Sequence, residues 1–160
     1  MSFIATARPP EPATELYVDG DGWYPALSPD DIRATCRLDG TVTPARLQHA
    51  TLAAIASVQA ELAAWRAARE LEGCASLAAV PAPQLNGESI KCHHYRRAVY
   101  ACLQADLAEA YREIDTTPSA TGKTERVIDH LNARIGEHRR AMRWAISDLL
   151  GIRRTTVDLI

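Results

Sequence analysis

The sequence predicts an all-α fold: an antiparallel helical bundle of three long helices and one short helix, with an extended N-terminal arm and a strand-like C-terminal tail. Apolar residues recur at alternating steps of three and four along three long stretches, which is the spacing of one helix face. Prolines and capping side chains mark where helices begin. The chain ends in an alternating stretch, residues 155–160, for which the sequence offers no partner strand.

The first 27 residues predict the arm. They contain four prolines and two glycines, which exclude a helix and favour an extended or disordered segment. Their side chains carry a net charge of -3, from one arginine against four carboxylates, whereas residues 134–154 carry +4, from six arginines against two carboxylates. The opposite charges would tie the arm either to its own core or, in a ring of subunits, to a neighbour.

Two helices follow the arm. Ser28 as N-cap and Pro29 in the first turn open a short helix that ends before residues 39–40, an Asp-Gly pair. Thr43 and Pro44 open a long helix, which Gly73 closes. The expected apolar face of the long helix comprises Leu52, Ile55, Val58, Leu62 and Trp65.

Two more long helices complete the expected bundle. A loop over residues 74–88 precedes a third helix, whose apolar face runs from Cys92 to Ile114, and a polar loop over 115–122 precedes a fourth helix capped by Thr124. The apolar seam of the fourth helix comprises Leu131, Ile135, His138, Met142, Ala145 and Leu149. The chain is therefore divided into an arm (1–27), a helical bundle domain (28–151) and a C-terminal docking tail (152–160).

Composition narrows the function classes. With 160 residues, 47% of them hydrophobic, the chain can bury a core of its own, and a formal charge of -2 gives no overall field for nucleic acid or an acidic membrane. Four cysteines without paired spacing predict reduced thiols in a cytoplasm. No apolar stretch approaches the roughly 20 residues that a membrane span needs.

The sequence contains only incomplete motifs for catalysis, cofactor binding and metal binding, so no catalytic, cofactor-binding or metal-ligating residue is predicted. Residues 121–124, Thr-Gly-Lys-Thr, resemble the end of a phosphate-binding loop, but Thr117 stands where the first glycine belongs. Cys92, His93 and His94 are metal-ligand types, yet neighbours on a helix point about 100° apart and cannot share one ion without further ligands. The chain is therefore not expected to be an enzyme.

Recognition of DNA is the alternative function. Residues 28–38 followed by a helix from Pro44 resemble a helix-turn-helix, with Arg46, Gln48 and His49 in the first turns of the second helix. The connection over residues 39–43 is longer than the usual turn, and the second helix continues for several turns with an apolar face. This alternative describes a helix-turn-helix DNA-binding regulator or packaging factor.

The C-terminal region predicts contact surfaces. Arg139, Arg140 and Arg143 form a basic contact patch near the end of the chain, beside Arg153 and Arg154. An unpaired alternating tail is typical of a segment that adds a strand to the sheet edge of another molecule.

Six blocks in one order resemble the phage head completion protein family of temperate contractile-tailed phages. They are RLDGTVTP (37–44), AAWRAA (63–68), GES (87–89), YRRAVY (95–100), RWAI (143–146) and TVDLI (156–160). The resemblance extends over residues 21–160. It implies a structural head-to-tail connector, with no catalytic residue carried over, found in the virion at the head-tail interface and in the host cytoplasm during assembly.

The same resemblance implies the partners. It implies a homo-oligomer, a ring of twelve subunits under the portal protein, which seals the DNA-filled head and offers an attachment platform to a tail terminator or completion protein. Packaged DNA would pass through the lumen without specific recognition, and no membrane would be involved. The residues expected to bind the portal are Arg153, Arg154, Thr155, Thr156, Val157, Asp158, Leu159 and Ile160.

Overall fold

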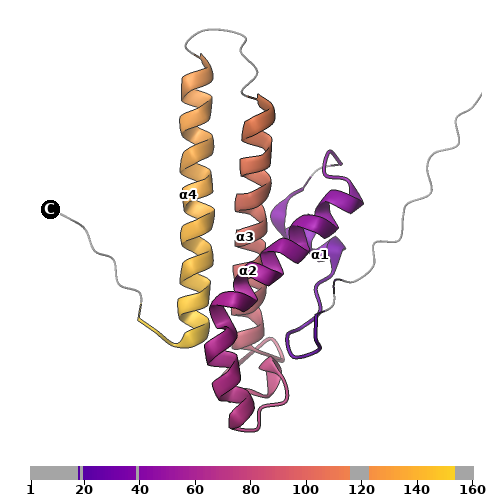
Figure 1. Ribbon diagram of the computed structural model, residues 1–160, viewed down its shortest axis with the longest axis vertical. Coiled ribbons are helices and arrows are strands. Elements are labelled where there is room, and N and C mark those ends of the chain that lie inside the picture. Colours follow the sequence, from indigo (N-terminus) through magenta and orange to yellow (C-terminus); the bar gives the residue numbers. More distant parts are fainter. Residues whose placement is uncertain (1–17, 19, 39, 116–122, 154–160) are drawn as a thin grey trace, which may run out of the picture.

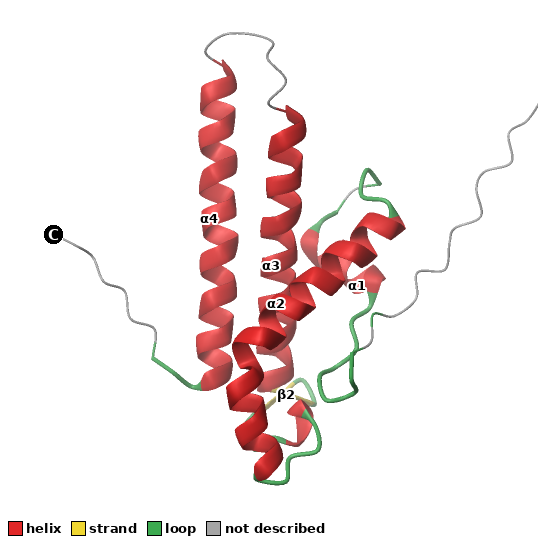
Figure 2. Cartoon of the chain, viewed as in Figure 1, coloured by secondary structure: helices red, strands yellow, loops and turns green. Residues whose placement is uncertain are grey.

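Four α-helices make up most of the protein (Figures 1 and 2). The computed structural model describes residues 18, 20–38, 40–115 and 123–153, of which 112–115 and 123–128 are described as backbone. The helices are α1 (Pro29–Cys36), α2 (Pro44–Leu71), α3 (Ile90–Asp115) and α4 (Lys123–Leu150). Between α2 and α3 lie a 3-10 turn, η1 (Leu77–Ala79), and two short strands, β1 (Gln84–Leu85) and β2 (Glu88–Ser89). The predicted helical class is confirmed.

The predicted caps lie at the starts of α1 and α2. The hydroxyl of Ser28 accepts a hydrogen bond from the amide of Asp31 at 3.4 Å, and Thr43 does the same for Arg46 at 3.4 Å. A proline occupies the first turn of each helix, where a missing amide hydrogen costs nothing. At the fourth helix the prediction was two residues late, because a cap at Thr124 places the first helical residue at 125, whereas α4 begins at Lys123.

The helices are arranged around α3. α4 runs antiparallel to α3 along its length, while α2 crosses α3 obliquely and makes few contacts with α4 (Figure 1). Three buried alanines, Ala98, Ala101 and Ala105, share one face of α3. Small side chains allow the backbones of two packed helices to approach closely. The result is a central helix covered on two sides.

The predicted apolar seam of α4 is confirmed. Ile135, Ala145 and Leu149 are buried, and the other three seam residues are half-buried. In α2, Ile55, Val58 and Leu62 are buried as expected.

Leu52 was assigned to the core face of α2, and this assignment is wrong. Its side chain is 48% exposed. The buried face continues toward the N-terminus through Ala54, Thr51 and Leu47 instead. Because consecutive residues are about 100° apart on a helix, a face that includes Thr51 turns Leu52 away from the core.

The end of the expected arm is part of the core. Val18, Trp23, Tyr24 and Leu27 are buried, so the interpretation of residues 1–27 as an arm does not hold for the described residues 18 and 20–27. Val18 and Leu27 exchange two backbone hydrogen bonds of 3.0 Å, which fold the segment back on itself. Residues 1–17 and 19 lie outside the described part of the chain.

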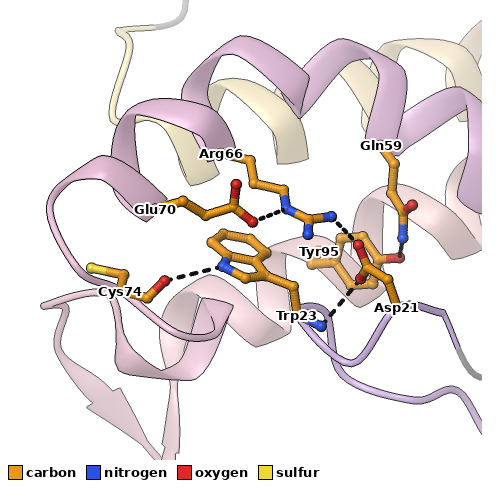
Figure 3. A network of polar contacts seen from close by, with 7 residues as sticks. All are labelled: Asp21, Trp23, Gln59, Arg66, Glu70, Cys74 and Tyr95. Carbon is orange, nitrogen blue, oxygen red and sulfur yellow. Dashed lines mark hydrogen bonds and ion pairs between the residues drawn. The ribbon is translucent and has the colours of Figure 1, made fainter.

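Aromatic and polar contacts hold this segment against α2 and α3 (Figure 3). The ring of Trp23 packs edge-on against that of Tyr24, with 4.7 Å between centroids, and Tyr24 stacks on Tyr95 of α3 at 4.6 Å. The indole nitrogen of Trp23 donates a hydrogen bond to the carbonyl of Cys74 at 3.2 Å. The guanidinium of Arg66 lies 5.0 Å from the Trp23 ring and pairs with Asp21. The apolar area that Trp23 and Tyr24 bury offsets the conformational entropy that this segment, rich in glycine and proline, loses on folding.

Residues 84–89 form a hairpin within the expected loop. β1 and β2 pair antiparallel around Asn86 and Gly87, whose φ angles of 53° and 77° are those of a two-residue hairpin turn. Glu88 receives hydrogen bonds from both terminal nitrogens of Arg96, at 2.5 and 2.7 Å, which joins the hairpin to α3. The hairpin therefore fixes the start of α3.

Replacing Trp23 with alanine should lower the free energy of unfolding by about 3–5 kcal/mol, because it empties a buried site. Chemical denaturation of the purified protein measures this. The control is Leu71→Ala, at a side chain that is 90% exposed, which should change stability by about 0.5 kcal/mol or less. Equal effects of the two variants would show that residues 20–27 do not belong to the core.

Acid should weaken the hairpin contact. Hydrogen bonds from Arg96 hold the pKa of Glu88 below its ordinary value of 4.5. A carboxylate whose pKa is lower in the folded than in the unfolded state stabilises the folded protein at pH values above its unfolded pKa. This contribution is lost as the pH falls through the lower pKa of the folded state. Glu88→Gln should therefore flatten the fall of melting temperature below pH 4.5, and Arg96→Gln should flatten the same region. An unchanged acid limb in both variants would contradict the pairing.

Candidate functional site

The C-terminal end of α4 is held in place by contacts with α3. The ammonium of Lys91 donates a hydrogen bond to the carbonyl of Leu149, and Arg97 lies 3.4 Å from the carboxylate of Asp148. Gly151 adopts a φ of 74°, and the amide of Ile152 donates to the carbonyl of Ser147 at 2.9 Å, which closes the helix. The tail therefore leaves the fold from a defined point.

Burial and the nearby charge of Arg69 lower the pKa of Lys91. Its ammonium also lies 5.8 Å from the centre of the Trp65 ring. The carbonyl of Leu149 is one of the helix-end acceptors that have no partner within the helix, so the cation satisfies it and opposes the negative end of the helix dipole.

Of the predicted portal-binding residues, Arg153 is the one that the described part of the chain includes, and it lies at this exit. Arg153 is exposed and follows Ile152, which is 60% exposed. Residues 154–160, which include Arg154, Thr155, Thr156, Val157, Asp158, Leu159 and Ile160, lie outside the described part of the chain. The structure thus fixes where the tail starts.

The three arginines of the predicted basic patch are exposed but differ in their contacts. Arg139 forms an ion pair of 2.7 Å with Glu109 of α3. Arg140 lies over the ring of Trp144, 5.5 Å from its centre. For Arg143 the described residues provide no carboxylate within ion-pair distance. The patch is therefore divided between an arginine bound to α3 and two arginines on the outer side of α4.

An apolar groove of about 490 Å³ lies between the N-terminal half of α2 and the C-terminal half of α3. Arg46 and His49 contribute from α2, and Asp106 from α3. The remaining lining residues are mostly apolar: Val42, Ala45, Ala50, Ala53, Leu107, Ala110 and Tyr111. A hydrogen bond of 3.1 Å between Thr41 and Tyr111 joins the two walls.

Asp106 is a half-buried carboxylate in this groove. Burial and the neighbouring charge of Glu109 raise its pKa, against the opposing charge of Arg139. The thiol of Cys102 lies 3.9 Å from its carboxylate. Asp106 has no ion-pair partner among the described residues, so a cation brought to the groove would stabilise its charged form.

Sequence analysis did not identify this groove or the surface around Trp144. Trp144 gives a signal in the sequence, because it lies beside the apolar seam of α4 rather than on it. The groove gives less signal, since Ala45 and Ala53 resemble ordinary helix formers. Only the oblique crossing of α2 and α3 brings its walls together.

The residues of the helix-turn-helix alternative are divided by the fold. Arg46 and His49 line the groove beside α3, whereas Gln48 is exposed away from it. α2 spans 28 residues and buries one face in the core. Its first turns are thus part of a helix-to-helix contact.

The remaining motif residues have structural contacts. Cys92 is buried, and a ring nitrogen of His93 lies 3.0 Å from the carbonyl of Leu85 in the hairpin. Burial lowers the pKa of His94. Within the described ranges, no group of three His, Cys, Asp or Glu side chains is placed to hold a metal ion. Thr121 and Gly122 of the Thr-Gly-Lys-Thr stretch lie outside those ranges.

The described surfaces combine an apolar groove, an exposed tryptophan under an arginine, and a fixed exit for the tail. Such surfaces on a helical framework are typical of a protein that binds other protein molecules. The chain belongs to the phage head completion protein (GPL) family, whose sequence model matches residues 18–160.

A curated relative shares this assignment along the whole chain. The head completion/stabilization protein of Escherichia phage P2 is 38% identical over 161 residues, an alignment that covers 100% of this chain and 93% of that protein. No solved structure matches the chain significantly.

The chain is thus a head completion protein of a phage and a component of the virion, in a family that is structural rather than an enzyme class. The proposed resemblance is confirmed. Among the described helices, none has the length and hydropathy required to cross a membrane.

Lys91→Met should free the end of α4, because methionine keeps the apolar stem and removes the donor to Leu149. We expect a loss of about 1–2 kcal/mol in unfolding free energy. Hydrogen exchange should also become faster at the amides of the last turn of α4. Arg143→Met, at an exposed position of the same helix, is the control and should leave both quantities close to those of the parent. Unchanged exchange in Lys91→Met would contradict the role of this contact.

Proposed function

We propose that the protein completes the head as a homo-oligomeric ring under the portal protein, with twelve subunits to match the portal. The ring seals the head after DNA packaging and provides the platform for a tail terminator or completion protein. The observation that carries this proposal is the 38% identity along the entire chain to a protein named for head completion and stabilization. Assembly takes place in the host cytoplasm, and the packaged DNA passes through the lumen without specific recognition.

The C-terminal tail is the portal-binding segment in this proposal. Arg153 starts it, and residues 154–160 continue it with alternating apolar and polar side chains. A strand added to a sheet edge on the portal gains affinity from backbone hydrogen bonds and specificity from alternate side chains. The fixed end of α4 supports this assignment, because it holds the residues that precede the tail in one position relative to α3.

Charge in the tail supports the same proposal. Arg153 and Arg154 precede the alternating residues and would meet acidic groups at the rim of the portal. In an extended tail, Val157 and Leu159 would share one face, and Thr156, Asp158 and Ile160 would share the other. The face with Val157 and Leu159 would then pack against the portal.

A chain that ends at Arg154 should melt close to the full-length temperature, because all the buried core residues of the described chain precede the tail. Packaged heads completed with this truncated chain should lose DNA or fail to accept tails. The measurement is DNA retention and tail attachment in heads made with a phage lacking the native protein. Normal heads with the truncated chain would refute the tail assignment.

Two matched substitutions separate the faces of the tail. Val157→Asp places a charge on the apolar face and should reduce portal binding at least tenfold. Thr156→Asp places the same charge on the opposite face and should retain binding. Equal losses would indicate a general effect of charge instead of strand addition.

A further inference from the structure

Two surfaces of the protein remain without an assigned role: the groove between α2 and α3, and the outer face of α4. α2 and α4 lie on different sides of α3 and make few contacts with each other (Figure 1). A subunit in a ring needs two different surfaces, one for each neighbour, because contacts in a ring are heterologous. The groove and the outer face of α4 are two different surfaces on separate helices, so one could contact each neighbour.

The outer face of α4 presents a projecting aromatic residue. Trp144 is 36% exposed, and the guanidinium of Arg140 lies 5.5 Å from the centre of its ring. Glu137 is on the same face, because positions 137, 140 and 144 follow steps of three and four. Tryptophan and arginine are the residue types that most often dominate protein–protein interfaces.

The groove is complementary to this face in shape and charge. Its walls are mostly apolar, and its volume of about 490 Å³ leaves room for a large side chain. Asp106, half-buried and without an ion-pair partner in the described chain, matches an arginine. Arg46, on the opposite wall, matches a carboxylate such as Glu137.

We propose that Trp144 of one copy inserts into the groove between α2 and α3 of a second copy, where Arg140 pairs with Asp106 and Glu137 with Arg46. This contact rests on the proposed function, since it is the interface that would join neighbours in the ring. It uses neither the tail nor the end of α4. Repetition of one heterologous contact closes a ring when the rotation between neighbours divides a full turn evenly.

Packaged DNA fits the outer face of α4 less well than a second copy does. Glu137 stands beside Arg140 and would face the phosphates, and Arg139 is already paired with Glu109 at 2.7 Å. An apolar groove with a carboxylate on its wall also fails to match a nucleic acid. A protein surface with charges of both signs fits the observations better.

Photo-crosslinking in packaged heads tests the contact directly. Trp144→benzoylphenylalanine should yield an adduct between two copies of the chain, with the second site in residues 45–53 or 106–111. Leu71→benzoylphenylalanine, at a side chain that is 90% exposed on a different surface, should yield no adduct in these residues. An adduct from position 144 to the portal, to DNA or to other residues overturns the proposal, as does the absence of any adduct.

Charge exchange provides a second test. Asp106→Arg and Arg140→Asp should each reduce the number of copies per packaged head at least tenfold, whereas the double variant should restore most of it. Melting temperatures establish that each variant folds. Ala110→Phe, which fills the groove without a change of charge, serves where Asp106→Arg fails to fold and should also reduce copies tenfold. Normal copy numbers in the folded single variants overturn the proposal.

Comparing packaged heads with and without the protein, together with the crosslinking result, distinguishes a failure of this proposal from a failure of the proposed function. If heads without the protein retain DNA and accept tails, the proposed function is wrong. If heads require the protein, yet position 144 forms adducts with the portal alone, the function stands and the subunit contact is wrong. An adduct between copies that maps to the groove, lost in Ala110→Phe, supports both.

Discussion

Burial of α3 is the constraint on which the other parts of the fold depend. Tyr95, Val99 and Leu103 are at most 1% exposed, and Ala98 on a neighbouring face is fully buried. A helix that is apolar on more than one face needs cover on each of them, because exposed apolar area costs about 25 cal/mol per Å². α2 and the segment around Trp23 cover one side and α4 covers another, so the cover helices lie apart. Their separation leaves the groove on one side of α3 and the outer face of α4 on the other.

Polar contacts then hold α2, α4 and the segment around Trp23 in one orientation against α3. Arg66 pairs with Asp21 and lies over the Trp23 ring, while Gln59 donates to the hydroxyl of Tyr95 at 3.2 Å (Figure 3). At the start of α3, Lys91 holds the end of α4. Such contacts contribute modestly one by one, but each joins elements far apart in sequence. The aromatic contacts provide burial, and the polar contacts provide a single orientation.

Sequence patterns predicted those features of the fold that depend on residues close to one another along the chain. Caps at Ser28 and Thr43 and the seam through Ile135 act within one helix, so their signals are local and the structure confirms them. The burial of Trp23 depends on Cys74 and Tyr95, which are distant in sequence, and composition alone favoured an arm. The hairpin does have a local signal, because Asn86–Gly87 is a favoured two-residue hairpin turn, although residues 74–88 were expected to form a loop. For the candidate site, the arginines were found because charge is visible in sequence, whereas the groove depends on a helix crossing.

The order of elements along the chain has a consequence for biosynthesis. The partner of the buried face of α2 is α3, and the partner of α3 is α4, which ends at Leu150 near the end of the chain. A ribosome therefore releases α1 and α2 before most of the surface that covers them exists. The apolar side of α2 has to remain without its cover until α3 has left the exit tunnel, and α3 waits in turn for α4. Folding is thus completed only after α4 has been synthesised, and a chain terminated early inside α4 is a target for chaperones and proteases rather than a competitor for assembly.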